Sequence, residues 1–369
     1  MTPAPLQLIA RCAAGRITGV SARNGRPFAA ALLCGHAPER AADMAGALFS
    51  LCGVAQRQAV LAACAAARGT ARPVDAAAGR AVLLESAQWD LWRLLLDWPA
   101  WAGLPPERAR FTALHRALGQ AADARSAAAC GQMVLDFVAE ALPGADDGAG
   151  SSSVRCEAGG GLVGRILAAL PSDASNAAAD APVAGLPPLS AAGFVAALPH
   201  DWPDAAFCRS PHLSGRVYET GALARHAGHP FVAGRLARGE RIAARLAARV
   251  VALAACGRRL RDGVSEADDG VPIDATPLPD GGGLAKVETA RGVLLHAVRL
   301  DGARVADYAI VAPTEWNFRP LGAFEHEAAA CVGLAPDAAR RRLEALALAL
   351  DPCVSFDVRV HTDEEVIHA

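Results

Sequence analysis

The apolar residues of most of this chain recur at spacings of three and four, which is the spacing of one face of a helix. The clearest case spans residues 233–262, where an apolar stripe is formed by Ile242, Leu246, Val250 and Leu253. A long alternating run, which is typical of half-buried strands, covers residues 286–317. The pattern therefore predicts a mainly α fold of the α+β class, a helical bundle that carries small β-hairpins.

Proline and glycine set the boundaries of the other predicted helices. The first begins at Pro38 and is broken near Gly53, with an apolar face formed by Met44, Leu48 and Leu51. The last must end before Pro352, because a residue that precedes proline disfavours the helical conformation. A second helix is predicted from Gly53 to about Arg68. The other predicted helices cover residues 80–99, which Pro99 ends, Glu107–Leu142, residues 233–262 and Asp337–Leu350.

A second stripe on the 233–262 helix is basic. It is formed by Arg238, Arg241, Arg245 and Arg249. Because a charged stripe opposite an apolar one usually faces water, we expect a solvated face here, with a docking surface as the alternative.

Two hairpins are expected. One lies near the N-terminus, with a type I′ turn at Asn24-Gly25, and one at about residues 285–315, with its turn at Asp301-Gly302. Loop composition predicts irregular segments at about 143–161, 172–188 and 262–283. With no repeat to divide it, the chain is interpreted as a single domain over residues 1–369.

Composition excludes several classes of function. The formal charge is −2 and the pI about 6.6, so no net positive field attracts nucleic acid or anionic lipid. No apolar run reaches the roughly 18 residues of a spanning helix, and the N-terminus lacks a secretory pattern. We therefore expect a cytoplasmic protein without membrane or nucleic-acid partners, whose ten scattered cysteines are reduced thiols. Arginine supplies almost all of its basic side chains, and Lys286 is its single lysine.

Five short motifs occur in a characteristic order along the chain. They are SLCGVAQ from Ser50, YETGALAR from Tyr218, VETARGVLLH from Val287, IVAPTEWN from Ile310 and LDPCVSFDVR from Leu350. Together they resemble the large subunit of nickel-iron hydrogenases, which has an early CGxC pair, a GPLAR stretch, an EAPRGxxxH hairpin, a VPTxWN segment and a final DPCxxC. The resemblance implies the fold of that subunit.

The resemblance also implies what this chain has lost. In the family, four cysteines hold nickel and iron, whereas here each pair keeps only its first member, Cys52 and Cys353. Ala55 and Phe356 occupy the second positions, and Thr18 replaces the acidic residue associated with proton transfer. Two thiolates cannot close a site for a soft divalent metal, which prefers about four ligands. We therefore expect no bound nickel and no enzyme activity.

What the chain keeps suits the iron's own ligands. In the family, the arginine of the PRG turn and the hydroxyl residue of the VPT segment bind the cyanide ligands, and the matching positions are Arg291 and Thr314, with Pro313 retained beside the threonine and Ala290 in place of the turn's proline. A buried cyanide nitrogen needs an N–H or O–H donor. The hairpin turn at Asp301-Gly302 would bring Arg291 and Thr314 to the same end of the hairpin.

These features resemble the hydrogenase accessory proteins of the HupK/HoxV type. That resemblance implies a scaffold that transiently holds iron with cyanide and carbonyl ligands, with Cys52 and Cys353 as metal ligands, together or with Cys353 alone. It implies two kinds of partner, the hydrogenase large subunit precursor and small iron-delivering chaperones. An interaction protein that binds those chaperones without holding metal is the alternative, and an iron-only metalloenzyme is the reading that the lost cysteines disfavour.

Five other polar positions are interpreted as structural. His296 is expected in the core with a hydrogen bond, Glu288 in a pair with an arginine, and Asp351 at the junction that follows the last helix. His226 and His229 are expected in a surface turn.

Overall fold

The computed structural model describes residues 6–25, 29–70, 75–143, 160–171, 182–263, 272–279 and 281–362. Its helices and strands confirm the mainly α, α+β class. Of the predicted irregular segments, most of 143–161 and of 172–188 lies outside the described residues.

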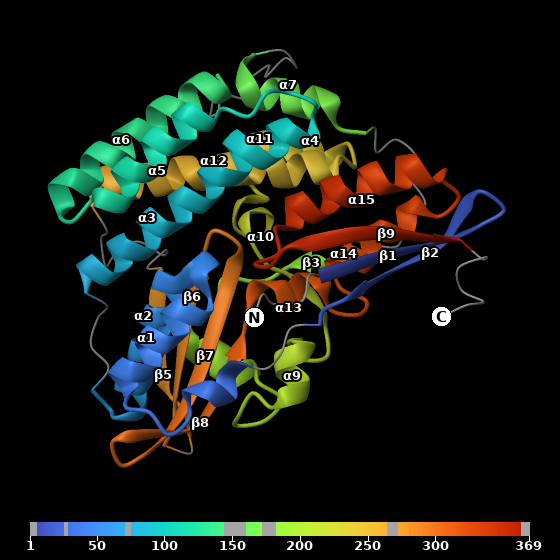
Figure 1. Ribbon diagram of the computed structural model, residues 1–369. Coiled ribbons are helices and arrows are strands. Elements are labelled where there is room, and N and C mark those ends of the chain that lie inside the picture. The colour runs from blue at the N-terminus through green and yellow to red at the C-terminus, as the bar shows by residue number, and fades with distance from the viewer. Residues whose placement is uncertain are drawn as a thin grey trace.

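The two ends of the chain meet in a three-stranded sheet. Strand β1 (Leu6–Ala13) pairs antiparallel with β2 (Arg16–Arg23) and parallel with β9 (Phe356–Thr362). Figure 1 shows this sheet beside α15 (Pro336–Leu350), in the order β2-β1-β9. The packing is possible because alternate residues of β1, beginning with Leu6 and Leu8, are buried. The end of α15 is therefore fixed relative to the first strand of the chain.

The N-terminal hairpin is present, but the predicted position of its turn was wrong. The turn is at Ala14 and Gly15, which both have positive φ, 48° and 72°. This is the conformation that a two-residue turn between right-twisted strands requires. Asn24 follows the end of β2, and its side chain donates to the Glu315 carboxylate at 3.3 Å.

A four-stranded antiparallel sheet forms the second β unit. It has the order β5 (Ile273–Pro277), β6 (Gly283–Thr289), β7 (Gly292–Asp301), β8 (Arg304–Val311). The predicted turn after Asp301 is confirmed, with Gly302 at a φ of 54°. The irregular segment expected at 262–283 was wrong in part, because β5 lies within it. The five residues of β5 form a strand because they pair with β6, and their own short sequence does not indicate that pairing.

Helices α1 (Pro38–Leu48) and α2 (Gly53–Ala67) lie on the four-stranded sheet, joined by a 3-10 turn, η2 (Ser50–Cys52) (Figure 1). The predicted break at Gly53 and the second helix are confirmed. The apolar face expected for the first helix was wrong, because Leu48 is 45% exposed whereas Ala41, Ala42 and Ala45 are buried. Small side chains let this helix approach its neighbours more closely than leucine would.

The helical body consists of long helices that pack around α12 (Arg241–Asp262). Pro99 does not end the predicted 80–99 helix, because α3 (Ala76–Trp92) continues through a π-helical turn, η3 (Arg93–Asp97), into α4 (Trp98–Trp101). The predicted 107–142 helix is two helices, α5 (Arg108–Gln120) and α6 (Ala124–Ala141), because Asp123 and Ser126 form a capping box that starts α6. The final helix, α15, is confirmed.

The remaining elements are short. They are η1 (Ala29–Leu33), α7 (Gly161–Ala169), β3 (Ala184–Gly185), α8 (Ala191–Ala197), α9 (Ala205–Arg209), β4 (Tyr218–Glu219), α10 (Ala222–His226), α11 (Pro230–Ala237), α13 (Pro313–Phe318), α14 (Ala323–Ala328) and η4 (Ala329–Cys331). Within the part of the chain that the structure describes, no helix combines the length and apolar character that crossing a bilayer requires.

The predicted helix over residues 233–262 is two helices, α11 and α12, and its basic stripe is not a solvated face, so both predictions were wrong. Arg245 and Arg249 are only 2% and 3% exposed. Arg245 forms a fork of two hydrogen bonds with Glu219, at 2.7 and 2.6 Å, and a further one with Glu327 at 2.6 Å. The stripe instead joins α12 to β4 and α14, because guanidinium groups can be buried where carboxylates pair with them. Only Arg238, which is followed by a break before α12, has a largely exposed side chain.

Glycine allows the close crossing of α6 and α12. A Cβ on Gly131 would lie 2.5 Å from the Gly257 carbonyl oxygen and 2.6 Å from the Arg261 nitrogen. We predict that Gly131→Ala lowers the free energy of unfolding by at least about 1–3 kcal/mol, because backbone atoms cannot move aside as a flexible side chain can. Urea unfolding measures the change.

The matched control is another helical glycine, Gly234 in α11. Its added Cβ would meet only the end of the Arg238 side chain, at 3.7 Å. Gly234→Ala should raise stability by up to about 1 kcal/mol through helix propensity. Equal effects of the two substitutions would contradict the close helix crossing.

The Glu327 pair makes stability depend on pH. Burial alone would raise the pKa of Glu327, but Arg245 and Arg241 outweigh it and lower the pKa from 4.5 to about 2. The stabilisation is therefore complete above pH 4.5 and is lost as the pH falls through 2. We predict that Glu327→Gln costs on the order of 3 kcal/mol near neutral pH and that the gap from the original protein narrows on acidification.

Urea unfolding at a series of pH values measures that gap. Glu140→Gln is the control, because Glu140 pairs with Arg110 at the surface, where a salt bridge contributes about 0–1 kcal/mol. A gap for Glu327→Gln that stays constant from neutral pH to pH 3 would show that this carboxylate is not the titrating group.

Candidate functional site

The turn between β6 and β7 places Arg291 at the centre of the molecule. Gly292 has a φ of 127°, and a Cβ there would lie 2.5 Å from the Thr220 hydroxyl, so only glycine fits. The Thr289 hydroxyl accepts from the Arg291 N–H at 3.2 Å and donates to the Gly292 carbonyl at 2.9 Å. These contacts hold the turn although Ala290 replaces a stiffer proline.

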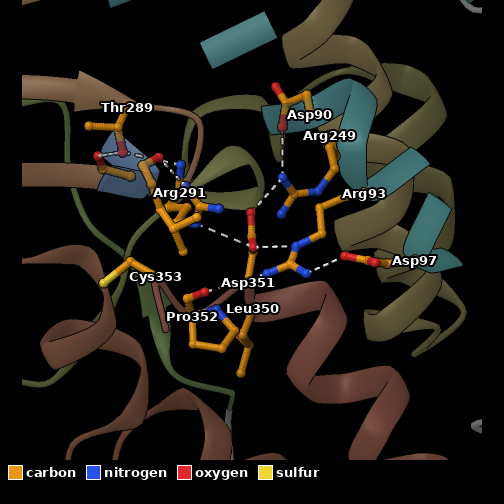
Figure 2. A network of polar contacts seen from close by, with 12 residues as sticks. Asp90, Arg93, Asp97, Arg249, Thr289, Arg291, Leu350, Asp351, Pro352 and Cys353 are labelled. Carbon is orange, nitrogen blue, oxygen red and sulfur yellow. Dashed lines mark hydrogen bonds and ion pairs between the residues drawn. The ribbon is translucent and has the colours of Figure 1, made fainter. Parts of the chain in front are cut away.

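Asp351 lies opposite this turn and ends α15. It is in the left-handed conformation, with φ 50° and ψ 71°, and is 1% exposed. Its carboxylate lies 2.7 Å from Arg93 Nε, 2.9 Å from Arg249 Nη1 and 3.4 Å from Arg291 Nε. Figure 2 shows these arginines converging on it from different segments. Burial opposes ionisation, but the arginines outweigh it and hold the pKa of Asp351 well below its usual range.

A second aspartate, Asp90, completes the group. Its Oδ1 accepts from Arg249 Nη1 at 2.7 Å, so one guanidinium bridges two carboxylates. Burial raises the pKa of Asp90 to about 6, against the attraction of Arg249. Sequence reasoning missed Asp90, Arg93 and Arg249. The signal for Arg249 was present: its neighbours in α12 on both sides are apolar, which favours burial of the whole stretch, and a buried arginine needs a paired carboxylate.

Cys353 follows Asp351 and Pro352 and is buried. Its backbone N–H donates to the Thr314 hydroxyl oxygen at 2.9 Å, and that hydroxyl donates to Cys353 Sγ at 3.0 Å. Thr314 follows Pro313 at the start of α13, directly after β8. Because β7 begins just after Arg291 and β8 ends just before Thr314, the hairpin brings both residues to one end, as its turn predicted.

Cys52 approaches the same place from the N-terminal half of the chain. It caps α2 and is partly buried, with Gln56 Nε2 at 3.5 Å from its Sγ. Burial, and next the Cys353 thiol, raise the pKa of Cys52 to about 12, whereas Gln56 and Arg291 act in the opposite direction. Arg291 Nη1 donates to the Leu51 carbonyl at 3.3 Å, one residue before Cys52. The structure thus brings Cys52, Cys353, Arg291 and Thr314 together.

Arg291 retains donor capacity in this arrangement. Its guanidinium carbon lies 5.1 Å from the centre of the Trp89 ring. Nη1 is used by Leu51, and Nε, which is buried, faces Asp351 without a hydrogen bond. Among the described residues, Nη2 donates no hydrogen bond. In the described ranges, no three Cys, His, Asp or Glu side chains lie close enough together to hold a metal ion.

The remaining sequence predictions concern residues around the site. His296 is fully buried and hydrogen-bonded to the Tyr308 hydroxyl at 2.7 Å, and Glu288 pairs with Arg225 at 2.8 Å, as expected. His229 caps α11, where it accepts from the Phe231 N–H at 3.3 Å. His226 is the last residue of α10 and is half-buried, so the surface turn was wrong for this histidine, and burial lowers its pKa to about 4.

Comparison with known proteins places this geometry in a family. Residues 203–359 match the model of the nickel-dependent hydrogenase family. The chain is 34% identical to the hydrogenase expression/formation protein HupK of Rhizobium leguminosarum bv. viciae, covering 89% of each chain. It is 32% identical to HoxV of Cupriavidus necator, covering 93% of each.

Solved structures agree on the fold. The reduced Ni-Fe-Se hydrogenase of Desulfomicrobium baculatum has a TM-score of 0.63 at 15% identity, covering 93% of this chain and 95% of that one. The Ni-Fe-Se hydrogenase of D. vulgaris Hildenborough has a TM-score of 0.58 at 15% identity, covering 92% and 94%. The chain has the fold of nickel-iron hydrogenase large subunits, and it belongs to the HupK/HoxV family of hydrogenase expression/formation proteins.

Proposed function

We propose that this chain acts in nickel-iron hydrogenase maturation as a scaffold that transiently holds an iron fragment with two cyanide ligands and one carbonyl ligand. The observation that carries the proposal is the convergence of two thiols with the donors of Arg291 and Thr314 at one end of the β7–β8 hairpin. The fragment is cargo, received from a small chaperone and passed to the large subunit precursor.

The donor groups suit cyanide. A cyanide nitrogen that leaves water needs a hydrogen-bond donor, because an unpaired buried acceptor costs about 1–3 kcal/mol. Among the described residues, Arg291 Nη2 donates no hydrogen bond and Nε faces Asp351 only as an ion pair, so N–H groups remain for a ligand, and the positive charge favours an anionic fragment. The Thr314 hydroxyl can rotate from Cys353 Sγ toward such a ligand, and Pro313 fixes the backbone beside it.

The two thiols suit temporary binding. Iron that carries its own diatomic ligands needs fewer protein ligands than a bare ion, and thiolates favour such a soft site. Cys353 is the better-placed ligand, because Pro352 and its own hydrogen bond to Thr314 fix its backbone. Cys52 would add a second sulfur. A site with two protein ligands can release its cargo more readily than one with four, and it gives nickel no closed set of thiolates.

The alternative function is that of an interaction protein, which has the same fold but holds no metal. The high pKa of Cys52 means that its thiol is protonated at neutral pH, and binding iron must displace that proton. A chain whose thiols stay protonated would bind the same chaperones through a surface like that of the large subunit and hold no cargo. Both functions place the protein in the cytoplasm, as an accessory protein without turnover.

Infrared spectroscopy distinguishes these two functions. Protein purified without air, from cells with an intact assembly pathway, should show cyanide and carbonyl bands in a region where protein is silent. Bound iron should accompany them. Protein that has neither bands nor iron would rule out the scaffold and favour the interaction protein, whereas hydrogen-dependent dye reduction would indicate an enzyme.

Arg291 allows a sharper test. We predict that Arg291→Ala lowers retention of the fragment by about tenfold or more, since a charged hydrogen bond contributes roughly 1.5–3 kcal/mol. The fold should persist, because Asp351 keeps Arg93 and Arg249. Iron content and infrared band area per chain measure retention after gel filtration. Arg57→Ala is the control, an exposed arginine that pairs with Asp43. Unchanged iron in folded Arg291→Ala protein would remove Arg291 from the site.

A further inference from the structure

A cavity of about 370 Å³ lies next to the turn that carries Arg291. Ala290 lines this cavity and also a small space bordered by Arg291. The charged groups around it come from β6, α3, α10 and α12, and they are Lys286, Glu288, Asp90, Arg225 and Arg259, with His226 beside them. Small-molecule sites have about this volume. None of these side chains has a role in holding the iron fragment.

We propose that this cavity binds a small molecule carrying a phosphate or carboxylate group. The Glu288 carboxylate forms ion pairs with two cations. Arg225 Nη1 is 2.8 Å from its Oε2, and Lys286 Nζ is 3.5 Å from its Oε1. Arg259 adds another guanidinium. The other acid, Asp90, is paired at 2.7 Å with Arg249, which does not line the cavity. The lining therefore has an excess of positive charge.

The histidine agrees with this charge. Burial, and next the positive charge of Arg225, lower the pKa of His226 to about 4. His226 is thus neutral at pH 7 and can accept or donate a hydrogen bond without adding charge.

Lys286 distinguishes the cavity from the rest of the protein. The chain has 36 lysine and arginine residues in all, and Lys286 is the single lysine among them. A lysine ammonium is a compact point charge, suited to an oxyanion that approaches from any direction, whereas the arginine fork is planar and larger. The Lys286 side chain is 14% exposed, so its ammonium acts in a shielded place and not on the open surface.

Ligand binding would also act on the neighbouring turn. Arg225 Nη1 donates to the Thr289 carbonyl at 3.4 Å as well as pairing with Glu288. Thr289 holds the Arg291 N–H. An oxyanion that replaces Glu288 as the partner of Arg225 would therefore change the hydrogen bond from Arg225 to the Thr289 carbonyl, which is part of the turn. The binding proposal stands independently of the iron proposal, because it concerns different side chains and can be tested on protein without iron.

The single lysine gives a site-specific signal. In protein labelled with ¹³C,¹⁵N-lysine, the side-chain resonances of Lys286 report on the cavity alone. We predict that they shift and saturate on titration with inorganic phosphate or with citrate, at constant ionic strength set with chloride. The arm that saturates at lower concentration identifies a phosphate or a carboxylate ligand. No saturable shift in either arm would overturn the proposal.

Two substitutions that change the charge of the cavity in opposite directions complete the test. Calorimetry measures the affinity of each variant for whichever of the two probes binds more tightly. Lys286→Met should weaken binding about tenfold, the scale of one charged hydrogen bond. Glu288→Gln should tighten it, because the internal competitor for Arg225 and Lys286 loses its charge. Arg57→Met, which removes an exposed charge on α2, should leave affinity unchanged. A folded Lys286→Met protein that binds as tightly as the original, or weaker binding by Glu288→Gln, would refute an oxyanion site.

Discussion

The buried carboxylate of Asp351 is the charge around which the site is organised. It draws together η3, α12 and the β6–β7 turn, since each supplies one arginine within ion-pair distance. A buried carboxylate without partners would cost several kcal/mol, so these pairs are a condition of the fold as well as a source of attraction. The same contacts offset the left-handed backbone of Asp351, which costs roughly 1–2 kcal/mol in a residue with a side chain. That backbone turn directs Pro352 and Cys353 away from α15 and toward Thr314.

The cluster is neutral in itself. Its arginines, Arg93, Arg249 and Arg291, face the carboxylates of Asp90, Asp97 and Asp351. Arg93 and Arg249 each contact two of these carboxylates, whereas Arg291 reaches only Asp351, at the longest distance of the set. The arginine with the weakest pairing is thus the one that borders the thiols. Donor capacity is left where a ligand could use it, while the other two arginines hold the structure.

The sequence predicted elements whose signal is local and missed those that depend on distant partners. The turn after Asp301 and the end of the last helix before Pro352 follow from residues that permit few conformations, and both were found. Strand β9 pairs with β1 across almost the whole chain, and no local pattern indicates that pairing. The type I′ signal at Asn24-Gly25 was overridden because strand pairing placed the turn at Ala14 and Gly15.

The largest error concerned the arginines of α12, and its cause is general. A basic stripe is solvated on a surface helix but paired on a central one, and one helix's sequence does not say which acids will face it. Glu219, Glu327 and Asp90 come from three other elements, and Asp351 follows the end of a fourth. Motifs in a known order were more informative for the site, because they placed Cys52, Arg291, Thr314 and Cys353 together without predicting a single contact between them.

The position of the two thiols has a mechanical consequence. Cys353 follows α15 and precedes β9, which is anchored to β1, so its backbone is held on both sides. Cys52 lies in a short 3-10 turn between α1 and α2 and is fixed mainly by the start of α2, where Glu85 accepts from the Val54 and Ala55 N–H groups at 2.8 and 2.9 Å. A ligand bound between them would be held by one rigid sulfur and one on a turn that a few hydrogen bonds restrain. Such an asymmetric pair can lose one bond before the other, and stepwise release of that kind would suit the proposed transfer of a cargo to a site with more thiolates.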